Sequence, residues 1–261
     1  MNLGRHARRA AYVGVITLSC FGIGSAGIQS QGPPPQPTPQ GVPQRPPIPP
    51  PSAQGPPQKP VVEKLGEKLF RIGTIRVDTD KRELAVVGRV NAVYGPLEFV
   101  ANTRGGMKAY ESAIELDTNG ITFHTACLLI GLDAGHSVRP TAHFDPRPPE
   151  GDAVDVLVSW QENGRERQIN AEQLLYDRER KASITNSRWV FTGSALVGGG
   201  MLLADAEGAL IGFVHTPAPV IENVSSDAVK RYGAIILNQE LGLKPGTPIT
   251  LTVRAIPQGK H

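Results

Sequence analysis

The chain has 261 residues, with 27 Lys and Arg against 24 Asp and Glu and a formal net charge of +3. Residues 1–60 hold five of the basic residues and none of the acidic ones, so residues 61–261 are close to neutral. This distribution argues against a nucleic-acid-binding surface. The two cysteines are too few to ligate an iron–sulfur cluster, and no cofactor is expected.

Residues 1–29 have the pattern of a secretion signal. Arginines precede an apolar stretch from Tyr12 to about Ile23, and small residues at 24–27 suit cleavage by a signal peptidase. We therefore expect a periplasmic or secreted protein. Two alternatives attach it to the membrane: retention of the apolar segment as an anchor, or lipidation of Cys20.

Residues 30–60 form a Pro/Gln-rich segment, in which positions 31–60 contain 14 of the 24 prolines. Proline fixes the backbone φ angle and removes an amide donor, which excludes both helix and central strand. We expect a disordered, polyproline-II-like tether between the signal and the folded part of the chain.

Residues 61–261 are expected to form a single β-rich domain. Alternation of apolar and polar residues predicts strands at 72–78, 83–90, 95–102, 109–116, 153–160, 165–170 and 246–256. The segments 95–102 and 109–116 are expected to form a hairpin across the turn "TRGGMK". One clear helix is predicted near 119–131, capped by Asp117 or Thr118, and 172–177 is a candidate for a short one. The predicted fold class is α+β, β-rich, with mainly antiparallel sheets.

The stretch "WVFTGSALVGGGMLLADAEG" at 189–208 combines a serine, three consecutive glycines and two acidic residues. A nucleophile elbow requires Gly-x-Ser-x-Gly before a helix, whereas Ser194 directly follows Gly193. A phosphate-binding loop requires a lysine that this stretch lacks. We therefore interpret "ALVGGG" as a connector between two strands, with "DAEG" as a turn.

Candidate metal-ligating residues are few and scattered. Glu111 carries a charge in the middle of a predicted strand, which is explained either by a catalytic role or by an outward-facing or paired carboxylate. His124 shares a helix face with Cys127, three residues later, although a buried cysteine usually packs as a small apolar residue. The remaining candidates stand at loop edges, where a solvated histidine is the alternative: His136, His143 and His215.

Several segments resemble the YdjY-type domain family of extracytoplasmic bacterial proteins: "IRVDTDKRELAVVGRVN", "GPLEFVANTRGGMKAYES", "CLLIGL" and "WVFTGS…LLADAEGALIGFVHTPAPVIE". The resemblance covers most of residues 70–256. It implies export but no established reaction, and it brings no catalytic residues to this chain. The family's "HES"-like triplet stands here as Tyr110-Glu111-Ser112, so a metal role for the first position is not implied.

The sequence thus identifies a compartment and a layout but no reaction. We expect an exported, tethered binding or accessory module at the cell envelope, whose partner is an envelope protein, a glycan or a small ligand. The alternative is a metal-dependent hydrolase using Glu111 and the loop histidines. Convergence of three such side chains within about 5 Å of one point would favour the hydrolase.

Overall fold

The computed structural model describes residues 59–257 except 94, 226–229 and 231. The expected signal peptide at 1–29, Cys20 and the linker up to residue 58 therefore lie outside the described residues. Within the described part, the α-helices are α1 (Gly120–Leu129) and α2 (Leu203–Glu207), and strands make up most of the remaining regular structure.

Eight strands close into a barrel in which each strand pairs with two neighbours. In order around the barrel they are β4 (Glu83–Val90), β17 (Pro248–Ala255), β7 (Asp152–Glu162), β11 (Trp189–Phe191), β15 (Ile221–Asn223), β14 (Ala209–Gly212), β5 (Phe99–Thr103) and β6 (Ser112–Leu116). The last strand, β6, pairs back with β4, which completes the ring. Closure leaves these eight strands without an open edge.

The expectation of mainly antiparallel sheets is wrong, because the barrel is closed and mixed. Strands β5 and β6 run parallel, and so do β14 and β15. The segment "TRGGMK" does not make a hairpin: a turn with Gly105 at φ 67° and the 3-10 helix η1 (Ala109–Glu111) return the chain to the start of β5. When a connection leads from the end of one strand back beside its start, the next strand runs parallel to the first. A tight hairpin instead makes the two strands antiparallel.

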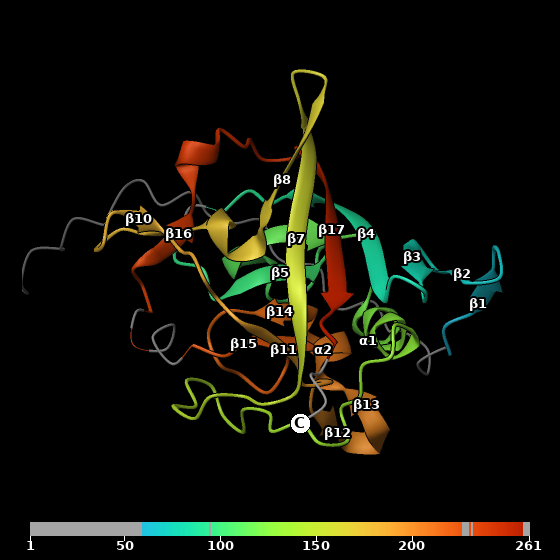
Figure 1. The fold of residues 1–261 in the computed structure, drawn as a ribbon. Helices are drawn as coiled ribbons and strands as arrows, with labels where there is room; N and C mark the ends of the chain where they lie inside the picture. Colours follow the sequence, from blue (N-terminus) through green and yellow to red (C-terminus); the bar gives the residue numbers. More distant parts are fainter. Residues whose placement is uncertain (1–58, 94, 226–229, 231, 258–261) are drawn as a thin grey trace, which may run out of the picture. The chain divides into compact units, whose positions relative to one another are not determined.

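The other strands extend or flank the barrel. The antiparallel ladder β1 (Val62–Lys64), β2 (Leu69–Ile72) and β3 (Ile75–Asp78) continues from β4 and projects away from the barrel in Figure 1. Strand β8 (Arg165–Asn170) forms a hairpin with β7. The remaining elements are η2 (Ala171–Leu174), β9 (Leu175–Asp177), β10 (Ala182–Ser183), β12 (Leu196–Val197), η3 (Gly198–Gly200), β13 (Met201–Leu202), β16 (Ile235–Leu237) and η4 (Gln239–Leu241).

The three long strands β4, β17 and β7 lie side by side (Figure 1). Successive side chains of a strand point to opposite faces of the sheet. Val86 and Val158 both stand in register with Leu251, and all three are buried in the core. Burying a side chain of this size contributes on the order of 1.5–3 kcal/mol. The next residue of β4, Val87, is 48% exposed, so the opposite face of these strands is the outer surface.

The N-cap of helix α1 is Asn119 and not the predicted Asp117 or Thr118, and its side chain accepts a hydrogen bond from the Thr122 amide. Gly131 ends it with a φ of 83°. Helix α1 packs on α2 through Gly120, where a Cβ atom would lie 2.5 Å from the Asp205 amide nitrogen. Asp205 is part of α2 and not of the predicted turn.

The three glycines join two strands, as predicted: β12 and β13 pair antiparallel on either side of η3. The predicted connector is shorter than expected, however, because Leu196 and Val197 belong to β12. Gly199 and Gly200 both have a positive φ. Ser194 is buried, donating a hydrogen bond to the Ala218 carbonyl and accepting one from the Ala204 amide. Its hydroxyl joins three segments of backbone, which is a structural role.

Candidate functional site

The candidates from the α1 helix do not form a metal-ligand pair. His124 packs beside the ring of Phe191, with the two centroids 5.5 Å apart. Burial, and secondarily the charge of Arg139, lower the pKa of His124. Cys127 is fully buried in the core, and burial raises the pKa of its thiol. Burial therefore favours the uncharged forms of both His124 and Cys127. Packing in the protein interior explains the two residues without a metal ion.

Two loop histidines are held by groups of their own. His136 lies on the surface, with Nε2 3.1 Å from Asp152 Oδ1 and Nδ1 3.7 Å from Asp133 Oδ2. His215 is fully buried, and its two ring nitrogens each lie 2.9 Å from a backbone carbonyl oxygen, of Asp145 and of Asn223. Both nitrogens of His215 are thereby engaged with the protein backbone.

Glu111 and His143 do approach a common residue, Glu98, which sequence reasoning missed. His143 Nε2 lies 2.9 Å from Glu98 Oε2, and Lys108 Nζ lies 2.9 Å from Glu111 Oε1. Burial raises the pKa of Glu98, and the charge of Glu111 raises it further. Burial opposes an increase in the pKa of Lys108, but the hydrogen bond and charge of Glu111 raise it overall. Glu111 is therefore a buried, paired carboxylate.

The five candidate side chains thus do not converge. Among residues 59–257, with the gaps given above, no three His, Cys, Asp or Glu side chains are arranged so that they could hold a metal ion.

A different site emerges on the outer face of the barrel, where the ends of β4, β6 and β17 meet β7 and β8. A surface pocket of about 440 Å³ opens there and contains charged, polar and aromatic side chains. Its lining includes Arg89, Arg104, Asp117, Ser159, Trp160, Gln161, Glu166 and Thr250. No histidine lines it.

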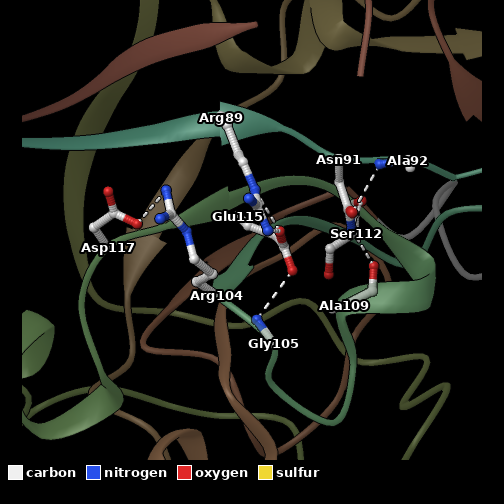
Figure 2. Close-up of polar contacts among 9 residues, drawn as sticks. All are labelled: Arg89, Asn91, Ala92, Arg104, Gly105, Ala109, Ser112, Glu115 and Asp117. Carbon is white, nitrogen blue, oxygen red and sulfur yellow. Dashed lines mark hydrogen bonds and ion pairs between the residues drawn. The ribbon is translucent and has the colours of Figure 1, made fainter. Parts of the chain in front are cut away.

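Arg89 is held against this pocket by Glu115. The two residues face each other in the register of β4 and β6, and Arg89 Nε and Nη2 lie 2.9 Å and 2.7 Å from Glu115 Oε2. The other carboxylate oxygen of Glu115, Oε1, accepts a hydrogen bond of 3.0 Å from the Gly105 amide (Figure 2). One carboxylate therefore connects strand β4 to the turn after β5.

Arg104, beside Gly105 in that turn, carries the second guanidinium of the pocket. Its Nη2 lies 2.5 Å from Asp117 Oδ1, and the two ion pairs stand next to each other in Figure 2. The side chains of Arg89 and Arg104 are 44% and 45% exposed, whereas that of Glu115 is 7% exposed. The cations thus reach the solvent while the anion behind them is covered.

On the opposite wall, Trp160 is almost entirely buried. The guanidinium of Arg167 lies 5.1 Å from the centre of its ring, and Arg167 also pairs with Glu162. This cation–π contact fixes the hairpin of β7 and β8 beside the pocket.

Sequence reasoning did not find this pocket. The alternation in "ELAVVGRV" places Arg89 on the same face as the exposed Val87, which is a signal for an outward-facing charge. Its partner, Glu115, is 26 residues away, and only the closure of the barrel brings the two together.

The sequence model of the YdjY domain matches residues 75–254. The chain belongs to the YdjY domain family. The match runs from the first residue of β3 to the penultimate residue of β17, so the YdjY domain includes the pocket and nearly the whole barrel. No curated protein and no solved structure matches the chain. In the described part of the chain, every helix is too short or too polar to cross a membrane.

Proposed function

We propose that this YdjY protein is an exported binding module of the cell envelope and that the pocket containing Arg89 and Arg104 is its ligand site. The proposal rests on one observation: the pocket is open to solvent, and the arginine side chains that line it are held in place by ion pairs. The pocket has a volume of about 440 Å³, and ion pairs orient both guanidiniums beside it. Preorganised polar groups around a concave surface are typical of ligand sites.

Export is supported by residues 1–29, with their basic start, apolar segment and small residues before the expected cleavage site. The proline-rich residues 30–60 would then separate the binding domain from its point of attachment or release. N-terminal sequencing of the extracytoplasmic protein tests this part: a new terminus within residues 24–30 is expected, and an intact Met1 or a lipidated Cys20 contradicts it.

The hydrolase alternative is less well supported, because only Glu111 and His143 of its proposed side chains lie near each other, beside Glu98, and each already has a partner. Glu111 is paired with Lys108, His143 with Glu98, and His215 with two backbone carbonyls. Hydrolysis of an envelope polymer by the purified chain, abolished by a chelator, would favour the hydrolase over the binding module.

The binding function is tested by co-sedimentation of the purified chain with isolated bacterial cell envelopes. Saturable binding is expected. Thr250→Trp should abolish it, because a bulky side chain would fill the pocket that Thr250 lines. Ala182→Trp is the matched control, since it places the same side chain at an exposed position of β10 outside that pocket. Absence of saturable binding, or equal binding by Thr250→Trp, would contradict the proposal.

A further inference from the structure

We propose that Arg89 and Arg104 together bind an oxyanion group of the ligand, a carboxylate or a phosphate carried on an envelope polymer. This inference rests on the proposed function, because it assumes that the pocket is the ligand site. It adds the chemical class of the ligand and the residues that select it.

The first argument is the geometry of the guanidinium of Arg89. A guanidinium has five N–H donors in a planar fork that matches two oxygens of a carboxylate or phosphate. Glu115 engages Nε and Nη2 of Arg89 through a single oxygen, and Nη1 takes no part in that contact. The Arg89 side chain is 44% exposed and lines the pocket, so the N–H donors that Glu115 does not engage are accessible to a ligand there.

The second argument is that the two cations are fixed relative to each other. Glu115 binds Arg89 through Oε2 and the turn that carries Arg104 through Oε1. Asp117, the residue directly after β6, pairs with Nη2 of Arg104. Because ion pairs already order both arginine side chains, binding of a ligand would cost the protein less side-chain conformational entropy. Glu115 is therefore a positioning residue for the oxyanion site.

The outer face of the barrel also contains a comparison pair. Arg254 on β17 approaches Glu83 on β4 through the same atoms, with Nε and Nη2 2.9 Å and 2.6 Å from Oε2. Its side chain is 48% exposed, close to the value for Arg89. Arg254 does not line the pocket, however. Substitution of Arg254 thus controls for the general loss of a surface ion pair.

The experiment uses the purified chain and three soluble oligomers of equal length: a uronic acid oligosaccharide, a glycerol phosphate oligomer and a neutral oligosaccharide. Binding is measured by isothermal titration calorimetry at low and high salt. We expect at least one charged oligomer to bind at least tenfold more tightly than the neutral one, and less tightly at high salt. Whichever charged oligomer binds more tightly identifies the source of the oxyanion.

Arg89→Lys retains the positive charge but not the planar fork, so we expect at least a tenfold loss of affinity for the charged oligomer. Arg104→Gln should have a comparable effect, whereas Arg254→Gln should stay within twofold of the unsubstituted chain. Far-ultraviolet circular dichroism verifies that each variant is folded. If Arg89→Lys does not fold, the Arg104→Gln result decides.

The inference is overturned if the neutral oligomer binds as tightly as the charged ones, or if Arg254→Gln weakens binding as much as Arg104→Gln. Envelope binding that Thr250→Trp abolishes would still stand in both cases, so the proposed function would survive. If the chain binds neither envelopes nor any oligomer, both proposals are wrong.

Discussion

Glu115 and Arg89 face each other across the short ladder that closes the barrel. That ladder pairs Gly88–Val90 of β4 with Ile114–Leu116 of β6. The charged wall of the pocket and the closure of the barrel therefore depend on the same few residues. We call this ladder between β4 and β6 the seam, and substitutions in it should affect both stability and ligand binding.

We expect Glu115→Gln to lower the free energy of unfolding by about 1 kcal/mol, because the cation that it pairs with is partly exposed to solvent. It should also weaken ligand binding, since the turn holding Arg104 loses its charged anchor. Urea unfolding and calorimetry measure the two effects. Glu83→Gln breaks the comparison pair with Arg254, and it should lower stability by a similar or smaller amount while leaving binding unchanged.

Gly88→Ala tests the seam directly. A Cβ atom on Gly88 would lie 2.3 Å from the Glu115 carbonyl oxygen and 2.8 Å from a Leu116 methyl carbon, so the two strands would have to move apart. We expect a loss of roughly 2 kcal/mol or more, measured by urea unfolding, because overpacking a close contact typically costs about 1–3 kcal/mol. Gly198→Ala is the control, since its Cβ atom would meet no atom within 4 Å. Equal effects of the two changes would contradict the close packing at the seam.

Glu222 on β15 should make stability depend on pH. It is completely buried, and burial raises its pKa well above the ordinary value, although a hydrogen bond from the Thr216 amide acts in the opposite direction. The folded state then retains a proton that the unfolded state releases. Its contribution to stability is complete below the pKa of the unfolded chain, near 4.5, and is lost as pH rises through the raised folded pKa.

Glu222→Gln should remove this dependence. The difference in unfolding free energy between the variant and the unsubstituted chain should shift in favour of the variant as pH rises from 5 to 8, by at most about 1.4 kcal/mol per pH unit. Thermal or urea unfolding at several pH values measures it. A difference that stays constant with pH would show that Glu222 titrates normally in the folded protein.

Ser194→Ala should lower stability by about 1–3 kcal/mol, because it removes a buried hydroxyl that bonds to Ala218 and to Ala204. Ser194→Gly loses the same bonds but relieves the backbone, which has a φ of 64° at this position. We therefore expect Ser194→Gly to be the less destabilised variant in thermal unfolding. Labelling of Ser194 in the folded protein by a fluorophosphonate probe would contradict its structural role.

Local pattern was sufficient to predict individual elements. Strand β4 occupies the predicted residues 83–90, and strand β8 the predicted 165–170. In β4 the alternating apolar residues form one buried face, so the existence of this strand depends little on which strands become its neighbours. Strand β8 has no buried residue, and it follows instead from the short turn that joins it to β7. The same holds for the connector between β12 and β13, where glycines permit a positive φ.

Which strands became neighbours was decided by the tertiary structure. Residues 95–102 and 109–116 look like the two arms of a hairpin, but η1 redirects the chain and β6 pairs parallel with β5 and antiparallel with β4. The pocket follows from that choice, because Arg89 meets Glu115 only where the barrel closes. Hydrophobic periodicity specifies which face of a strand is buried, but the partner across the sheet depends on the packing of the whole chain.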